Sequence, residues 1–390
     1  MTAEVSLGAL GLHRGGHLLL TLALRALPVG GRLVVRGSDP ALSVHLRAWC
    51  RSQGHRLDLG AAPTITRGAA EVGRWQGAQR AGSLGEPVAH PQATWGLAAR
   101  GARVEAGGPA FAFPLSDKDT VWTDDAARIY AQAAAAQWDP ATAIDWDAPF
   151  ELPDDVEDAV VQVMTYLIEN EVAALLVPSR FLTKLHPHFR EVAQVLAIQA
   201  ADEARHIEVF TRRAGLKRQE LGLSTTGGQA SLKTLLDEPD FALASFLLSV
   251  LGEGSFLSLL RFLQAHAPDP VTRQVARLSA QDEARHVAFG LAHLRRHASQ
   301  EPGLLSRLAT AIERRHDALA HTAGLNEEVF DALVLLAAGS WAPADLARGF
   351  DRVVALKEDM DAGRRLRLQR LGFSEAEAAR LSGLHTRNFM

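Results

Sequence analysis

The sequence predicts a mainly α-helical protein, in which a small two-layer α/β domain precedes a four-helix bundle with extra C-terminal helices. Glycine and proline are frequent before about residue 150, and the apolar runs there are short. Beyond that point, long segments repeat apolar residues at helical spacing with few helix breakers. The 390 residues are enough for one large core and a smaller domain.

The N-terminal α/β domain is expected to span residues 1–62. Helical "GGHLLLTLALRAL" is followed there by strand-like "GRLVVRG" and by a helix that runs from "SDPA" through "LSVHLRAWCRSQG". Residues 63–150 are expected to connect this domain to the bundle, with "ARVEA" and "AFAFP" as candidate strands. The segment "AQWDPATAIDWDAPFELPDD" is expected to pack on the bundle as its lead-in.

The bundle is expected over residues 151–300, with helices at about 153–186, 188–213, 239–266 and 269–298. Pro178 should kink or end the first of these helices. The glycines on both sides of Glu253 each weaken a helix by about 1 kcal/mol, which predicts a local distortion there. Residues 301–390 are expected to form three or four further helices that pack on the bundle.

Composition excludes several classes of protein. The net charge of -4 and the absence of Lys/Arg runs argue against nucleic acid and membrane surfaces as partners. The apolar stretch "FALASFLLSVLGEGSFLSLL" is interrupted by Ser, Gly and Glu253, so we expect no membrane span. The single cysteine, Cys50, excludes an intramolecular disulfide and a cysteine-based metal cage. Without a signal-like N-terminal segment, the protein is expected in the cytoplasm.

A five-residue motif, Asp-Glu-Ala-Arg-His, occurs twice, at residues 202–206 and 282–286. Residues three apart share a helix face, so the acid and the imidazole of each copy can point at one object. In both helices they interrupt a row of apolar residues. One copy taken alone would favour a solvated helix segment with internal ion pairs. Two copies, both in apolar rows, favour instead buried acids that are balanced by cations.

The other two bundle helices each supply an acid in an apolar row. In the third helix this acid is Glu253. The first helix offers Glu169 and Glu171, and the continuous apolar row passes through Glu171, so Glu169 is expected beside the ligands or at the rim. The predicted metal ligands are therefore Glu171, Glu203, His206, Glu253, Glu283 and His286.

This ligand set indicates a pair of metal ions. One Glu from each of two helices and a Glu-x-x-His from each of the other two is the arrangement of di-iron and di-manganese carboxylate bundles. Four carboxylates balance two divalent cations, and oxygen and imidazole donors suit iron or manganese. The expected cofactor is two Fe ions or a Mn/Fe pair.

The remaining residues of the motif are predicted to support the ligands. Metal-bound imidazoles usually donate their second N–H to an oxygen, and Asp202 and Asp282 could accept it from their own or from the facing histidine. Arg205 and Arg285 could neutralise these aspartates, or could form plain salt bridges on the helix surface.

Over about residues 120–390 the paired motif resembles the ferritin-like di-iron superfamily. "NEVAA" followed by "DEARH" is similar to hydroxylase subunits of bacterial multicomponent monooxygenases. "DEARHIEVF" with "DEARHVAFG" more closely resembles ligand-binding oxidases related to ribonucleotide reductase small subunits, and p-aminobenzoate N-oxygenase-like proteins. The chain departs from these families: Phe210 stands at the usual radical tyrosine of the reductase subunits, and Ser279 at an extra histidine of the N-oxygenases.

Residues 10–58 resemble the small sulfur-carrier fold of the TusA and SirA proteins, through "LGL", "LPVGGRLVV", "SDPA" and "RAWCRSQGH". The working Cys-Pro of that family is replaced here by His13-Arg14, so sulfur transfer is not expected. Cys50 is expected to be a small buried hydrophobe. The domain would then dock a partner, shield the site or orient subunits.

The resulting hypothesis is an O2-activating di-metal oxidase or oxygenase that acts on a small organic substrate, with an electron-donor protein and a homodimer as open questions. Small residues near the ligands, such as Ala174 and Gly290, either leave room for substrate or serve close helix packing. Two alternatives are an iron-handling protein without oxygenase turnover, with the N-terminal domain as adaptor, and a scaffold with vestigial ligands.

Overall fold

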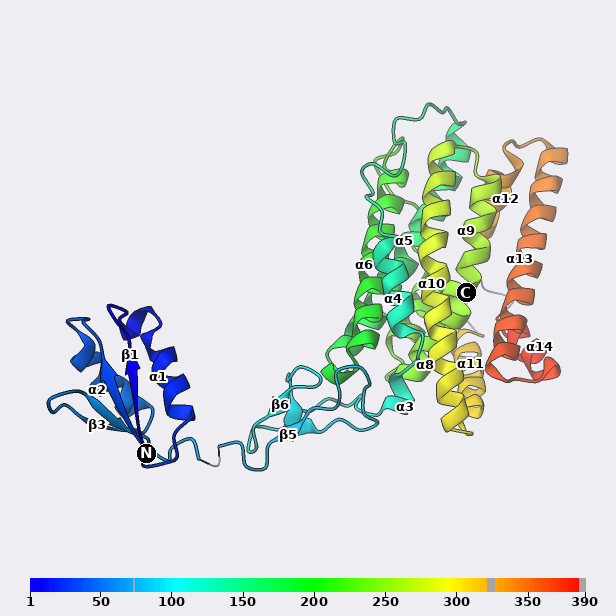
Figure 1. The fold of residues 1–390 in the computed structure, drawn as a ribbon. Coiled ribbons are helices and arrows are strands. Elements are labelled where there is room, and N and C mark those ends of the chain that lie inside the picture. Colours follow the sequence, from blue (N-terminus) through cyan, green and yellow to red (C-terminus); the bar gives the residue numbers. More distant parts are fainter. Residues whose placement is uncertain (73, 321–326, 386–390) are drawn as a thin grey trace. The chain divides into compact units, whose positions relative to one another are not determined.

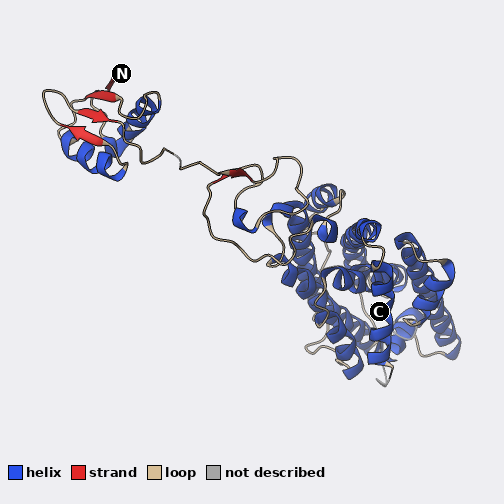
Figure 2. Ribbon diagram, turned by 90° about the horizontal axis from the view of Figure 1, so that it is seen from below, coloured by secondary structure: helices blue, strands red, loops and turns tan. Residues whose placement is uncertain are grey.

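The computed structural model describes residues 1–72, 74–320 and 327–385 (Figure 1). The chain forms two compact units, and each is described by itself. The first comprises Met1–Arg80 and Arg103–Gly108, and the second comprises Ala81–Ala102 and Pro109–Met390. The strands that the structure describes all lie in the first unit, whereas the second is built from helices and loops (Figure 2).

The first unit contains a separate two-stranded sheet and a larger part, in which a four-stranded sheet packs with two helices. The elements of the larger part are β1 (Thr2–Ser6), the short 3₁₀ helix η1 (Leu12–Arg14), α1 (Gly16–Arg25), β2 (Arg32–Arg36), α2 (Leu42–Ser52), β3 (Arg56–Asp58) and β4 (Thr64–Thr66). The strand order is β1-β2-β4-β3, with β1 parallel to β2 and β4 antiparallel to both of its neighbours. Because β4 lies between β2 and β3, the four-stranded sheet extends along the chain to Thr66.

The core of this unit joins the buried rows of α1 and α2 to the sheet. Leu20, Leu46, Leu33 and Ile65 are fully enclosed in it. Cys50 lies in the same cluster, and burial raises the pKa of its thiol to about 11. The side chain is therefore a neutral buried thiol at physiological pH, as the sequence predicts.

Of the two candidate strands in the connecting region, one is confirmed. The segment "ARVEA" contains β6 (Arg103–Val104), which pairs with β5 (Gln79–Arg80). The segment "AFAFP" is not a strand in the described structure. The rings of Phe111 and Phe113 stack instead with centroids 6.2 Å apart, and the amide of Phe111 donates to the carbonyl of Ala93 in an irregular loop.

The second unit contains the four predicted bundle helices, and each end lies within four residues of its predicted position. They are α5 (Asp154–Leu182), α6 (Arg190–Ala214), a three-part helix made of α8 (Phe241–Ser245), η4 (Phe246–Glu253) and α9 (Gly254–His266), and α10 (Pro270–Gln300). Local signals set the helix starts: Asp269 caps α10 by accepting from the Thr272 amide at 2.8 Å, and Pro270 follows. Pro178 does not end α5, which continues to Leu182.

The remaining helices surround this bundle. Before it lie α3 (Lys118–Val121) and α4 (Ala126–Ala135), and α7 (Thr226–Leu236) lies between α6 and α8. After it come α11 (Leu304–Leu319), α12 (Glu327–Ala338), α13 (Pro343–Leu371) and α14 (Glu375–Gly383). The segments 321–326 and 386–390 of the predicted C-terminal region lie outside the described residues.

By length and composition alone, two described helices are long and apolar enough to cross a membrane, Asp154–Leu182 and Phe241–His266. The bent pair of α12 and α13 would be a third if its two helices were counted as one span. The most apolar 18-residue stretch of each helix is largely buried within the protein, 67% of it in Asp154–Leu182 and 89% of it in Phe241–His266. Their apolar residues therefore pack against other helices of the bundle, and each carries a buried glutamate in its row.

Candidate metal centre

The six predicted ligands meet in the middle of the bundle. Glu171 comes from α5, Glu203 and His206 from α6, Glu253 from the end of η4, and Glu283 and His286 from α10. None of the six is more than 4% exposed. Their ligand atoms form two groups, each within 4.8 Å: Glu171, Glu203, His206 and Glu283 in one, and Glu203, Glu253, Glu283 and His286 in the other.

Glu203 and Glu283 belong to both groups because each reaches both imidazoles. Nδ1 of His206 lies 3.2 Å from Oε2 of Glu203 and 3.3 Å from Oε1 of Glu283. Nδ1 of His286 lies 3.0 Å from Oε1 of Glu203 and 3.5 Å from Oε2 of Glu283. The arrangement therefore offers two neighbouring cation positions that share two carboxylates.

Several ligand atoms are buried without a partner. Oε1 of Glu171, Oε1 of Glu203, Oε2 of Glu253, both carboxylate oxygens of Glu283 and Nδ1 of His286 form no hydrogen bond with any described residue. Such groups normally lie buried only when they are paired, because each orphan costs about 1–3 kcal/mol or more if charged. Cations bound between these atoms would supply the missing partners, so the donor set fits a metal pair.

The far side of each imidazole is held by an aspartate of the facing helix. Nε2 of His206 lies 3.2 Å from Oδ2 of Asp282, and Nε2 of His286 lies 3.2 Å from Oδ2 of Asp202. This resolves the alternative that the sequence left open, since each aspartate serves the other copy's histidine. An Nε2–H that donates to the aspartate leaves Nδ1 free to bind a metal.

Arg205 is buried and joins the two copies of the motif. Its side chain is 9% exposed, and its Nη2 donates to Asp202 at 2.5 Å and to Asp282 at 2.9 Å. The interpretation of Arg205 as a surface salt bridge is therefore wrong. Arg285, whose side chain is 15% exposed, bonds to Asp282 of its own helix.

Two residues that sequence reasoning did not assign complete this network. Trp138 donates from Nε1 to Oδ2 of Asp282 at 2.8 Å, and its ring lies 4.6 Å from the Arg205 guanidinium. Gln137 donates to Oδ1 of Asp202 at 2.8 Å and accepts from Arg205 at 2.6 Å. Both belong to the lead-in segment, and they are neighbours in the sequence. The signal that the sequence offered was the expectation that this segment packs on the bundle.

The electrostatics of the ligands shows that protons and cations compete for this site. Burial, and then the charges of Glu203 and Glu283, raises the pKa of Glu171 well above its usual value, and the same causes raise the pKa of Glu253. Burial opposes charge on His206, but its close contacts with Asp282 and the surrounding glutamates outweigh this and raise its pKa. These groups therefore bind protons more tightly than usual, and a bound cation would compete with those protons.

The helix that carries Glu253 is distorted, as the flanking glycines predict. Residues Phe246–Glu253 form a π-helical segment, a type often found at functional sites. Gln199 of α6 donates from Nε2 to Oε1 of Glu253 at 2.8 Å. The distortion and this hydrogen bond together set where the carboxylate enters the site.

A small cavity adjoins the glutamate side of the site. It is lined by Asn170, Glu171, Ala174, Leu235, Leu248, Gly252, Glu253, Phe256 and Glu283. About 20 Å³ is accessible to the centre of a water molecule, which is room for about one small molecule. Glu169 lies half-buried outside both ligand groups.

The small residues near the ligands divide between the two roles proposed for them. Ala174 and Gly252 line the cavity and leave space. Gly290 serves close packing, because a Cβ there would lie 2.6 Å from the Ser249 side chain. Phe210 is fully buried, and its ring centroid lies 6.2 Å from that of His206.

No protein-family model matches the sequence, and no curated protein matches it. Solved structures do match. Two point variants of an R2-like ligand-binding oxidase with an aerobically reconstituted Mn/Fe cofactor are each 18% identical with a TM-score of 0.51. They cover 65% of this chain and 95% and 98% of their own chains.

A Synechococcus protein with aldehyde deformylating oxidase activity is 17% identical over 59% of this chain and 96% of its own, with a TM-score of 0.42. The likeness to the R2-like oxidases shows the fold. The prediction of a ferritin-like helical bundle preceded by a small α/β region is thus confirmed.

Proposed function

We propose that this protein is an O2-activating non-haem di-metal oxidase or oxygenase that uses two iron ions or a manganese–iron pair. The observation that carries the proposal is the convergence of four carboxylates and two imidazoles from four helices, with buried ligand atoms left unpartnered. Structures with the same fold hold a Mn/Fe cofactor, which supports the choice of metals.

Each ligand has a distinct place in this proposal. Glu171 and His206 would hold one ion, and Glu253 and His286 the other, while Glu203 and Glu283 would touch both. The chemistry supplied there would be the reduction of O2 by a redox-active metal pair.

The protein's own residues would fix the geometry and keep bulk water out. Asp202 and Asp282 hold the imidazoles through Nε2, and Arg205 compensates the charge of both aspartates. Gln199 restrains one oxygen of Glu253. Because the ligands are almost fully buried, charges in the site are screened far less than they would be in water.

The cavity points to the side from which O2 would reach the site. Its lining includes Glu171, Glu253 and Glu283, together with the apolar side chains of Leu235, Leu248 and other residues already listed. A single small molecule fits the space as it stands. A larger organic substrate would require the lining to move.

The test is to load the protein with Fe(II), or with Mn(II) and Fe(II), without oxygen, and then to measure O2 consumption with a reductant. We expect O2 uptake at two ions per chain, with faster uptake when a suitable organic substrate is added. Iron that accumulates beyond two ions per chain without product would instead indicate an iron-handling protein.

Two neighbouring glutamates supply a matched control for this experiment. Glu171→Ala removes a ligand and should abolish O2 uptake. Glu169→Ala removes a half-buried acid two residues away and should leave O2 uptake at the wild-type rate. The substrate, the electron donor, the cytoplasmic location and the sulfur-carrier-like N-terminal domain stay predictions.

A further inference from the structure

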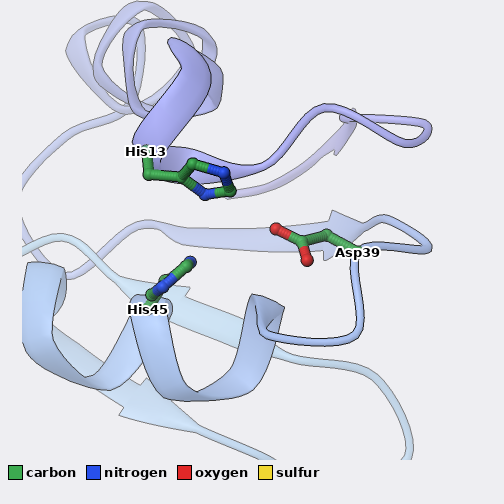
Figure 3. A group of neighbouring side chains, drawn as sticks. All are labelled: His13, Asp39 and His45. Carbon is green, nitrogen blue, oxygen red and sulfur yellow. The ribbon is translucent and has the colours of Figure 1, made fainter.

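The first unit contains a second group of metal-ligand side chains, far along the chain from the six glutamate and histidine ligands of the bundle. His13 lies in η1, Asp39 lies in the loop between β2 and α2, and His45 lies in α2. One ligand atom from each residue lies within 4.8 Å of the others. Figure 3 shows the three side chains directed toward the same space between η1 and the start of α2.

Two of these three residues bury a polar atom that has no partner. Oδ1 of Asp39 accepts from the amide of Ala41 at 3.0 Å, which fixes the carboxylate at the start of α2. Oδ2 of Asp39 and Nδ1 of His45 are shielded from solvent and have no hydrogen-bonding partner among the residues that the structure describes. A buried carboxylate oxygen is costly to leave unpaired.

The packing of the two histidines does not supply the missing partner. The rings of His13 and His45 meet edge to face, with centroids 5.2 Å apart. His13 is exposed and His45 is half-buried, and the contact between their rings gives Oδ2 of Asp39 no donor. A cation bound between the two rings and the carboxylate would satisfy both orphaned atoms.

Gly11 keeps this space open. A Cβ at Gly11 would lie 2.5 Å from Oδ2 of Asp39, 2.6 Å from Cε1 of His13 and 2.8 Å from Nδ1 of His13. The φ angle of Gly11 is -71°, so glycine is not required there by the backbone conformation. Its lack of a side chain matters for the room it leaves beside the two ligand atoms.

We propose that His13, Asp39 and His45 bind one divalent transition-metal ion. Two imidazoles and one carboxylate suit Zn²⁺ or another borderline metal, and three protein ligands leave a position for water or an external ligand. Tetrahedral ligands about 2.0–2.1 Å from one ion lie roughly 3.4 Å apart, so ligand atoms that lie within 4.8 Å of one another would have to close by up to about 1.4 Å. This site is independent of the function proposed for the bundle.

The test is Zn²⁺ binding to the full chain that carries Glu203→Ala and Glu283→Ala, so that uptake by the bundle is suppressed. We expect one ion per chain by titration with equilibrium dialysis. Asp39→Asn should weaken binding by about 100-fold or more, since loss of a ligand exceeds the 10–100-fold cost of losing a ligand's support. The asparagine keeps an oxygen for the Ala41 amide, so the turn should survive.

Two further variants complete the test. Asp58→Asn is the matched control, because Oδ1 of Asp58 accepts from the Gly60 amide at 3.1 Å in the same way but Asp58 lies outside the cluster. It should bind Zn²⁺ as the background chain does. Gly11→Ala keeps all three ligands but should weaken binding, with the far-UV circular dichroism unchanged.

The outcomes that would overturn the proposal are equally direct. A background chain that takes up no Zn²⁺ would show that the His13–His45 contact is ring packing alone. Equal Zn²⁺ binding by the background chain, Asp39→Asn and His45→Ala would place the ion elsewhere. Neither result would bear on the metal pair of the bundle, because Glu203 and Glu283, which belong to both of its ligand groups, are absent from the background chain.

Discussion

The two copies of Asp-Glu-Ala-Arg-His have the same letters but different surroundings. In both, the Glu and His face the metal site and the Asp holds the histidine of the facing helix. The arginines differ: Arg205 is buried and bonds to the aspartates of both copies, whereas Arg285 is more exposed and bonds to Asp282 of its own helix.

This asymmetry comes from residues outside the motif. The lead-in segment brings Trp138 to Asp282 and Gln137 to Asp202, and Trp138 also covers the guanidinium of Arg205. The repeated motif therefore places the same Glu and His side chains in both helices. The lead-in segment determines which of the two arginines is buried among the aspartates. Variants made in matched pairs, one in each copy, measure how far the two copies differ.

The largest effect is expected where the two copies are equivalent. Glu203→Ala and Glu283→Ala should each abolish binding of the metal pair, because each carboxylate belongs to both ligand groups. Metal analysis of the purified variants, with circular dichroism to confirm retained helices, is the measurement. A variant that keeps its full metal content would exclude that glutamate as a ligand.

Metal affinity should depend on pH, because the histidines of both copies and the glutamates of the other two helices bind protons as well as metal ions. The pKa values of Glu171, Glu253, His206 and His286 are all raised, so these groups bind protons more tightly than usual, and protons compete with metal ions for them. Affinity should therefore fall as pH falls, by about tenfold per pH unit for each proton displaced. Titrations with Mn²⁺ between neutral and mildly acidic pH would show it, and an affinity independent of pH would contradict it.

Replacing the arginine of each copy should lower the free energy of unfolding by different amounts. Arg205→Gln removes a buried partner of two carboxylates and should lower the free energy of unfolding by about 3–5 kcal/mol. Arg285→Gln removes a partner of Asp282, which keeps Arg205 and Trp138, and should cost about 1 kcal/mol. Urea unfolding of both variants measures the difference, and equal losses would mean that the copies are equivalent after all.

The aspartates should show the smallest difference between copies. Asp202→Asn and Asp282→Asn each disturb the hydrogen bond to Nε2 of a facing histidine, and each should weaken metal binding by about 10–100-fold. We expect the larger loss for Asp282→Asn, because Asp282 also faces Arg205, Arg285 and Trp138. Isothermal titration with metal ions measures the affinity of both variants. A variant that binds metal as tightly as the wild type does would show that its aspartate does not support the ligand histidine.

The convergence of the six acid and imidazole side chains could be predicted from the sequence because helical periodicity is a strong local signal. An acid in an apolar row must be buried, and that reasoning selected Glu171 over Glu169 and found Glu253. The glycines beside Glu253 likewise predicted the distortion that appears as the π-helical segment. These features depend on positions within one helix.

Features that depend on contacts between distant segments were not predictable in the same way. The spacing of the motif allowed Asp202 to serve either histidine, and only the packing of α6 against α10 assigns it to His286. The roles of Gln137 and Trp138 come from the path of an irregular lead-in. The place of β4 in the first sheet and the loop at Phe111 are also set by tertiary packing.

The most direct test of the central claim is anomalous scattering from crystals of the protein loaded with iron and manganese, grown without chelator. The account predicts two metal peaks, one near Glu171 and His206 and the other near Glu253 and His286, with Glu203 and Glu283 in contact with both. A single peak, a ligand from outside these six residues, or an empty site under these conditions would contradict it.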